Sequence, residues 1–412
     1  MFASPPIGVN NLGLPMGSPL FNAPSLSPAP APVSDPLPIT PPEASFDRAI
    51  NYYADYSGCG FWRMIWPEHV INAYQKAVIH GTTMMVLDER YYENTKSVRL
   101  QRQATDHQLR FLRLLKEFQK RQNFRIMYDI DDIVFSEDIP DYNKFKGAFT
   151  DPSIRECALN IMQEVDEITV TCKFMQEYYK SKTGNSNVTV IPNCPPRFWM
   201  GNFYSEEKVN RDYLTHKKKP RVVYPASGAH FDVDNRVKQR DDFFHVNEAV
   251  IKTVDQIQWV FIGAFPLSLG SLVQQGKIEF HPWQSLYDYP RMLGELDFNM
   301  FIAPLQDSTF NKAKSDLKYI EACCYGLPIA CQNLCTYGNA PYKFTTGDEM
   351  IDRIKHCLRD EDTYMKISKE SRAVADSRWL ENPDNVGKFH EAYIHPYKSP
   401  ERKLINSLAE NQ

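Results

Sequence analysis

The chain lacks any long apolar run and any strong excess of charge of one sign. Its 412 residues are 42% hydrophobic and 24% charged, and the formal net charge is −4. No stretch approaches the roughly 18 apolar residues of a membrane-spanning helix, so we expect no stable membrane insertion. The near balance of charge excludes a protein that binds polyanions over its whole surface. The length allows two domains.

The chain also lacks the cysteine patterns of a disulfide framework or a zinc site. It has nine cysteines, an odd number. Cys331 and Cys335 come nearest to a metal-ligand spacing, but no second pair accompanies them. The N-terminus has neither the basic start nor the apolar core of a signal peptide. We therefore expect reduced thiols, no metal and a cytoplasmic location.

Proline is concentrated at one end of the chain. The first 42 residues hold twelve of the 29 prolines and a single charged residue, Asp35. Such a segment buries too little apolar surface to offset its ordering entropy. We predict a disordered tail over 1–45, with folded sequence from Phe46.

Apolar runs then alternate with helical patterns, which favours parallel sheets flanked by helices, an α/β fold. Strands are predicted at 83–88, 125–130, 167–171, 187–191, 221–225, 258–263, 277–280, 298–305 and 327–331. Helices are predicted at 68–80, 104–122, 153–166, 173–181, 241–254, 285–295, 315–325, 347–359, 361–376 and 384–393.

A charged stretch without apolar period, 205–220, divides this alternation, and we interpret it as an interdomain linker. The predicted domains are 46–204 and 221–383, followed by a C-terminal helix and tail over 384–412. Two such domains normally bind ligand in the crevice between the carboxyl ends of their strands.

One predicted helix carries a stripe of charge. In "NKAKSDLKYIEACCYGLP" (311–328), Lys314, Lys318 and Glu321 stand at i, i+4 and i+7. The ordinary interpretation is a solvated face with a Lys–Glu pair. However, the helix follows a predicted strand, so its N-terminus is expected at the carboxyl edge of the sheet. Ser315 is the predicted N-cap, and Gly326 is expected to end the helix.

The position of this helix suggests a ligand. Free N–H groups at 315–318, the positive end of the helix dipole and two lysines together suit a diphosphate. Glu321, one turn deeper, would accept hydrogen bonds from a diol such as ribose. The motif therefore predicts a nucleotide site.

At this point the sequence resembles a family. The segments "FIAPLQDSTFNKAKSDLKYIEACCYGLPIA" (301–330), "WVFIGAF" (259–265) and "YPASGAHFD" (224–232) resemble the donor domain of GT-B glycosyltransferases, in particular family-4-like enzymes. "GCGFWRMIWP" (58–67) and "VTVIPNCPP" (188–196) are more weakly similar to the acceptor domain. The resemblance implies two Rossmann-like domains facing across a crevice. It also implies sugar transfer from a nucleotide sugar to a hydroxyl acceptor, retaining and metal-independent.

The resemblance also implies individual roles. Glu321 matches the glutamate that binds the donor ribose, and Lys314 and Lys318 lie where the diphosphate is held. A small-residue turn after the first donor-domain strand approaches the phosphates. The expected donor-binding residues are therefore Ser227, Gly228, His230, Lys314, Ser315, Lys318 and Glu321.

The sequence departs from the family pattern in two places. Many members carry a second glutamate, which contacts the sugar, where this chain has Ala313. The usual donor-domain arginine and lysine pair is not cleanly placed, and the candidates are Arg236, Lys238 and Arg240. The sugar and the leaving-group contacts are thus left open. Ala313 also leaves open a non-catalytic binding protein with this fold.

The segment "MYDIDDIVF" (127–135) puts carboxylates at the end of a predicted strand. Asp129-x-Asp131 fits three interpretations: the metal-binding motif of a GT-A glycosyltransferase, a phosphatase nucleophile motif, or a crevice-edge element of the acceptor domain. A structural cap on the next loop is a fourth. We favour the acceptor-domain element, in which Asp129 or Asp131 accepts the proton of the acceptor hydroxyl.

The acceptor side is the less specific part of the prediction. The resemblance places Gly60 and Arg63 toward the acceptor, and Arg102 lies in a segment, 96–125, with nine Lys or Arg against two acids. A solvated face, an anionic membrane surface and nucleic-acid phosphates all explain such a segment. Stand-alone relatives in large bacterial viruses glycosylate hydroxymethylated DNA bases, and others act on surface glycans or lipids. We lean to double-stranded DNA, with the host cytoplasm as the location if the chain is viral.

Overall fold

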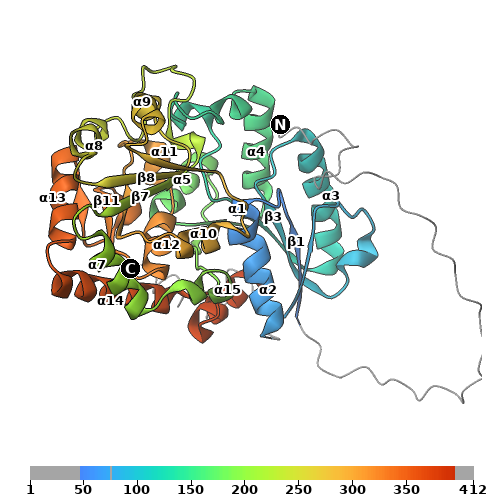
Figure 1. Cartoon of the computed structure of the whole chain (residues 1–412). Helices are drawn as coiled ribbons and strands as arrows, with labels where there is room; N and C mark the ends of the chain where they lie inside the picture. The colour runs from blue at the N-terminus through green and yellow to red at the C-terminus, as the bar shows by residue number, and fades with distance from the viewer. Residues whose placement is uncertain (1–46, 75–76, 395–412) are drawn as a thin grey trace, which may run out of the picture. The chain divides into compact units, whose positions relative to one another are not determined.

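The computed structural model describes residues 47–74 and 77–394, so the tail predicted over 1–45 and the last part of the segment predicted over 384–412 lie outside the described residues. Within the described part, twelve strands form two six-stranded sheets in which every pair of neighbouring strands is parallel. The predicted α/β class is therefore confirmed. In Figure 1 helices flank the strands of each sheet.

The first sheet has the order β2-β1-β3-β4-β5-β6 and the second β12-β11-β10-β7-β8-β9. The first contains β1 (Arg48–Tyr52), β2 (Val78–Thr82), β3 (Thr95–Gln101), β4 (Arg125–Asp129), β5 (Glu167–Val170) and β6 (Val188–Val190). The second contains β7 (Arg221–Ala226), β8 (Gln258–Gly263), β9 (Glu279–Pro282), β10 (Met300–Ala303), β11 (Ile329–Gln332) and β12 (Lys343–Phe344).

The helices between the strands follow the predicted pattern over most of the chain. Those of the first half are α1 (Gly58–Gly60), α2 (Trp66–Ala73), α3 (Asp106–Gln122), α4 (Pro152–Glu164), α5 (Lys173–Thr183) and α6 (Arg197–Met200), with a π-helical turn over Phe61–Ile65. Those of the second half are α7 (Glu206–His216), α8 (Asn247–Thr253), α9 (Gly270–Gln274), α10 (Tyr289–Glu295), α11 (Thr309–Lys312), α12 (Leu317–Cys324), α13 (Gly347–Cys357), α14 (Glu361–Arg378) and α15 (Pro383–Ile394).

The elements between residues 47 and 101 differ from the prediction. The strand expected at 83–88 is not a strand, and β2 occupies the end of the helix expected at 68–80. Strand β1 was not among the expected strands, whereas β3 (Thr95–Gln101) covers most of "SVRLQRQ" (97–103), whose alternation indicates a strand. In β3 the polar Ser97, Arg99 and Gln101 are buried, so the strand lacks the continuous apolar run on which the prediction relied.

The segment 205–220, predicted as a linker, contains a packed helix. Ser205 caps α7 by accepting a hydrogen bond from the Lys208 N–H, and Val209 and Tyr213 are buried. The Tyr213 ring stacks on Tyr364 of α14, with the centroids 4.5 Å apart. Because only one face of α7 is apolar and that face is narrow, its sequence reads as a charged linker.

The last described helix returns to the first sheet. Phe389 and Tyr393 of α15 share a buried cluster with Trp62, Trp66 and other residues of the first half. The Arg99 guanidinium donates to the Ala392 carbonyl at 2.8 Å and lies 3.8 Å from the centroid of the Tyr393 ring. Helix α15 therefore joins the end of the described chain to its beginning.

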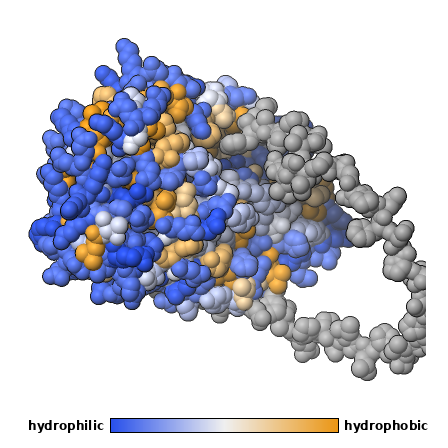
Figure 2. Space-filling model, in the orientation of Figure 1, coloured by the Kyte–Doolittle hydropathy of each residue, from blue (hydrophilic) through white to orange (hydrophobic). Residues whose placement is uncertain are grey.

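Among the described residues, none of the helices is both long and apolar enough to cross a bilayer. Figure 2 shows hydrophilic residues over most of the visible face, with hydrophobic residues in separate patches.

Candidate functional site

The charged motif forms two short helices and the turn between them. Helix α12 begins at Leu317, with Asp316 at the N-cap position, so the prediction of Ser315 as the N-cap was wrong. The Ser315 hydroxyl instead accepts a hydrogen bond from the Asn193 side chain at 3.2 Å. Arg378 binds the Asp316 carboxylate at 3.1 Å and thereby fixes the start of α12. Gly326 follows α12 with φ +64°, as expected for a glycine that ends a helix.

The two predicted lysines meet at one histidine. The Lys314 Nζ lies 3.4 Å from His230 Nδ1, and the Lys318 Nζ lies 3.4 Å from His230 Nε2. His230 belongs to the turn Gly228–His230 after β7, which Ser227 caps by accepting from the Ala229 N–H. The structure thus brings the predicted turn and both lysines together, although they are far apart in the sequence.

His230 is neutral in this arrangement. Its Nδ1 lies 2.8 Å from the Asp242 carboxylate, so Nδ1–H donates to Asp242 and the Nε2 lone pair accepts from Lys318. Burial, with the charges of Lys314 and Lys318, lowers the pKa of His230 to about 3. At neutral pH the ring therefore orients Lys318 without adding a charge.

Asp242, which was not predicted, holds the site together. Its buried carboxylate accepts from the Tyr142 hydroxyl at 2.6 Å, the Asn311 amide at 2.6 Å and the Gln306 N–H at 2.9 Å. Burial alone would raise the pKa of Asp242, but the His230 hydrogen bond and the Lys314 charge lower it overall. The signal in the sequence was a pair of carboxylates, Asp241 and Asp242, directly before two phenylalanines.

Glu321 lies on α12 beside Lys318, one turn deeper. The Tyr289 hydroxyl donates to its Oε2 at 3.2 Å. Burial raises the pKa of Glu321, against the opposing charge of Lys318. Burial and the neighbouring Lys314 lower the pKa of Lys318. The two charges are thus held in a poorly solvated place without an ion pair within 4 Å.

The other donor-side cations lie on an exposed loop. Arg236, Lys238 and Arg240 are exposed, and Arg236 pairs with Asp234 at 2.6 Å. The buried Asp232 carboxylate shapes this loop by accepting from the N–H groups of residues 236, 237 and 239.

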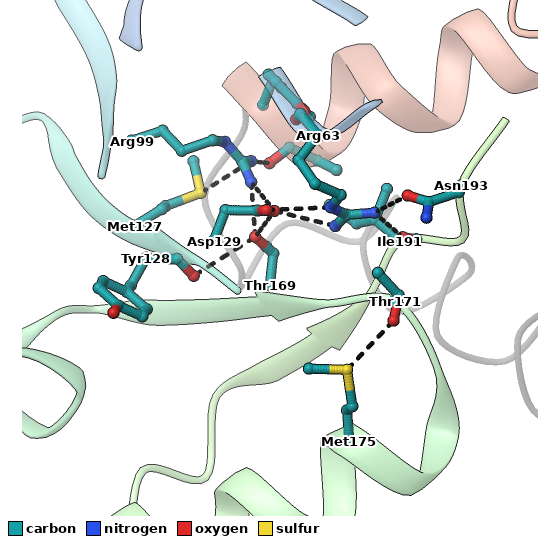
Figure 3. A network of polar contacts seen from close by, with 12 residues as sticks. Arg63, Arg99, Met127, Tyr128, Asp129, Thr169, Thr171, Met175, Ile191 and Asn193 are labelled. Atoms are coloured by element: carbon teal, nitrogen blue, oxygen red, sulfur yellow. Dashed lines mark hydrogen bonds and ion pairs between the residues drawn. The ribbon is translucent and has the colours of Figure 1, made fainter. Parts of the chain in front are cut away.

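Asp129 and Arg63, predicted to act on the acceptor, form a buried ion pair with each other. The guanidinium of Arg63 donates to both carboxylate oxygens of Asp129 at 3.0 Å, and neither side chain is more than 1% exposed. Figure 3 shows Arg99 and Thr169 on the same carboxylate, at 3.3 and 2.6 Å. Arg63 also binds Asn193, at 2.9 Å. This burial argues against direct contact of Asp129 or Arg63 with a substrate.

The remaining acceptor-side residues do meet. Arg102 binds Asp55 at 2.9 Å and lies 3.7 Å from Asp131, whose side chain is 13% exposed. The Gly60 N–H donates to Asp55 at 3.2 Å. A Cβ on Gly60 would lie 2.0 Å from the Asp55 carbonyl oxygen, which explains the glycine. Gly60, Arg102 and Asp131 thus form one cluster.

Asp132, the next residue, lies within electrostatic reach of Lys314 on the donor side. Burial raises its pKa to about 6, while Lys314 on the other half opposes the shift. The motif 129–132 therefore splits into a structural carboxylate, Asp129, and two more accessible ones, Asp131 and Asp132.

The basic segment 96–125 is largely neutralised within the fold. Its cations contact acids or a backbone carbonyl: Lys96–Asp47, Arg99–Asp129, Arg102–Asp55, Arg110–Asp106, Arg113–Glu164, Lys116 with the Glu164 carbonyl, Lys120–Glu117, Arg121–Glu89 and Arg125–Asp166. The segment therefore offers less free positive charge than its composition indicated.

Among the described residues, no group of three or more His, Cys, Asp or Glu side chains is arranged to hold a metal ion.

Comparison with known proteins places this geometry in a fold family. No family model and no curated protein matches the sequence. Among solved structures, HepE of Anabaena in complex with UDP and glucose is 11% identical, with a TM-score of 0.54 over 84% of this chain and 98% of that one. The fold is GT-B-like. A glycosyltransferase from Rickettsia africae is 12% identical, with a TM-score of 0.56 over 84% of this chain and 97% of that one. TarM is 10% identical, with a TM-score of 0.50 over 75% and 57%.

Proposed function

We propose that the protein is a glycosyltransferase that moves a sugar from a nucleotide sugar to a hydroxyl acceptor. The observation that carries the proposal is the convergence of Lys314 and Lys318 on His230, with no carboxylate within 4 Å of either lysine among the described residues. Partly buried cations without acidic partners are costly unless an anion arrives. The structural likeness to HepE with UDP and glucose, and to the Rickettsia glycosyltransferase, supports this reading.

The chemistry follows from these positions. Departure of a nucleoside diphosphate develops negative charge, which Lys314 and Lys318 stabilise through fixed positive groups. Glu321, held by Tyr289, accepts the ribose hydroxyls. Asp131, beside Arg102 and Gly60, is the proposed acceptor of the proton from the acceptor hydroxyl. We propose a retaining reaction without a metal.

For the acceptor, the hydroxymethylated base of DNA remains our candidate, with a surface glycan or lipid-linked saccharide as the rival. Cations of segment 96–125 that already pair with acids attract DNA phosphates less strongly than free ones. The structure therefore gives the glycan or lipid acceptor more weight than the composition of the segment did.

The test uses the purified chain with UDP-, GDP- and ADP-sugars, offered hydroxymethylated duplex DNA or saccharide acceptors. Nucleoside diphosphate release and the mass of the acceptor are measured together. We expect release with one donor and a sugar mass on one acceptor class. Donor binding without turnover would favour the non-catalytic protein, and no binding of any donor would refute the nucleotide site.

A further inference from the structure

A third lysine reaches the donor-side turn from the other half of the chain. The Nζ of Lys144 lies 3.2 Å from the position that a Cβ would take on Gly228, and its Cε lies 3.5 Å from that position. Gly228 is in the turn that carries His230, on which Lys314 and Lys318 converge. Lys144 follows the first sheet's β4, whereas the other two lysines follow β10 of the second sheet.

The backbone beside Lys144 is anchored to the donor side. The preceding residues Tyr142 and Asn143 are buried, at 4% and 2% exposure. The Tyr142 hydroxyl donates to Asp242 at 2.6 Å, and the Asn311 amide reaches the same hydroxyl at 3.1 Å. The Asn143 side chain accepts from the Phe145 N–H at 2.9 Å and closes the turn. Lys144 is thus presented from an anchored turn.

Its neighbour on the same turn behaves differently. Lys146 is bound to Asp141 at 2.6 Å. Lys144 has no carboxylate within 4 Å among the described residues, and its Nζ lies 5.0 Å from the centroid of the Phe145 ring. Lys144 is thus an exposed cation beside Gly228, and Gly228 belongs to the three-residue turn that carries His230, which Lys314 and Lys318 contact.

We propose that Lys144 is the third cation of the diphosphate site, so that the acceptor-side half supplies a charge to the leaving group. This inference rests on the proposed nucleotide site. Lys144 would supply a positive charge in place of the donor-domain arginine and lysine pair, whose candidates Arg236, Lys238 and Arg240 lie on the loop shaped by Asp232. A Cβ on Gly228 would lie 3.2 Å from the Lys144 Nζ, so a side chain there would narrow the space between Lys144 and the turn.

The test measures binding of UDP, GDP, ADP and inorganic pyrophosphate to the wild-type chain and to Lys144→Ala, Lys144→Arg and Lys146→Ala. We expect Lys144→Ala to weaken pyrophosphate and diphosphate binding by about 10- to 100-fold, the loss of one charge-assisted contact. Lys144→Arg keeps most of the affinity, and Lys146→Ala keeps all of it. Uridine, which has no phosphate, should bind the wild type and Lys144→Ala equally.

The outcomes separate the two proposals. If the wild type binds none of the four probes, the nucleotide site and the role of Lys144 both fail. If the wild type binds a diphosphate and Lys144→Ala binds it as tightly, the role of Lys144 fails and the nucleotide site stands. Equal weakening by Lys144→Ala and Lys146→Ala would also overturn the inference, because it would show a general effect of charge. Melting temperatures of the exposed-residue variants control for folding.

Discussion

Lys318 and Glu321 are both shifted toward their uncharged forms, because their surroundings solvate charge poorly. Their opposite charges moderate the shift without forming a close pair. Two poorly solvated charges at this distance lower the stability of the protein without a ligand. A ligand that binds Lys318 or Glu321 would offset this loss of stability. The residues that we propose to bind substrate are thus recognised as poorly solvated charges without a close ion-pair partner.

The first prediction concerns pH. The pKa of Lys318 is lowered in the free protein, and a bound dianion would raise it again. Binding at a pH near or above the lowered value therefore takes up a proton, and UDP affinity should fall as pH rises from 7 to 9.5. Calorimetry in buffers of different ionisation enthalpy measures the uptake. Lys318→Ala should lose this dependence, and its affinity should fall by about 1–3 kcal/mol. A pH-independent affinity in the wild type would contradict the assignment.

A second prediction separates Asp129 from Asp131. Asp129→Asn removes the charge that pairs with buried Arg63 and Arg99, so we expect a loss of about 3–5 kcal/mol in the free energy of unfolding. Asp131 is 13% exposed and lies 3.7 Å from Arg102, so we expect Asp131→Asn to cost less free energy of unfolding than Asp129→Asn but to reduce transfer. Urea unfolding measures the stability of both variants, and initial rates of sugar transfer measure their activity. Full transfer activity of Asp131→Asn would remove Asp131 from the proposed mechanism.

At the scale of elements, the junction after α12 explains why "Gly-Leu-Pro" follows the motif. Gly326 adopts φ +64°, and a Cβ there would lie 2.3 Å from the Tyr204 ring. The Leu327 N–H reaches the Ala322 carbonyl at 3.0 Å and closes the helix before β11. The turn therefore fixes the position of α12, which carries Lys318 and Glu321, relative to β11.

A third prediction follows from a matched pair of glycines. Gly184 ends α5 with φ +72° but has no atom near its Cβ position, whereas Gly326 has the ring of Tyr204. Gly184→Ala should cost about 1–2 kcal/mol for the left-handed conformation alone. Gly326→Ala should cost that amount and about 1–3 kcal/mol more for overpacking. Urea unfolding measures both variants, and equal losses would show that Tyr204 yields without cost.

At the scale of the whole molecule, α15 and Asp129 connect distant parts of the chain. Asp129 sits at the end of β4 and gathers Arg63, Arg99 and Thr169. Arg99 in turn holds α15, and the Tyr393 hydroxyl donates to the Arg63 carbonyl. One buried polar network thus links the first sheet to the last described helix.

A fourth prediction tests this link. Tyr393→Phe removes only the hydroxyl, and we expect a loss of about 1 kcal/mol in the free energy of unfolding. Tyr393→Ala also removes the ring that lies against Arg99, and should cost about 3–5 kcal/mol. Thermal and urea unfolding of both variants provide the measurement. A small effect of Tyr393→Ala would mean that α15 contributes little to the stability of the first half.

The sequence by itself determined the α/β alternation and the motif that bears Lys314, Lys318 and Glu321. These are local patterns: apolar period, glycine turns and spacing along a helix. Only the tertiary structure decided that Asp129 and Arg63 are buried together, that Asp242 orients His230, and that Lys144 reaches Gly228. The Asp129–Arg63 and Lys144–Gly228 contacts join residues far apart in the chain, and a loop separates Asp242 from His230, so spacing along a helix or strand carries no signal for any of the three. The sequence thus shows which chemical groups are available, and the packing of the folded chain decides which of them can face a ligand.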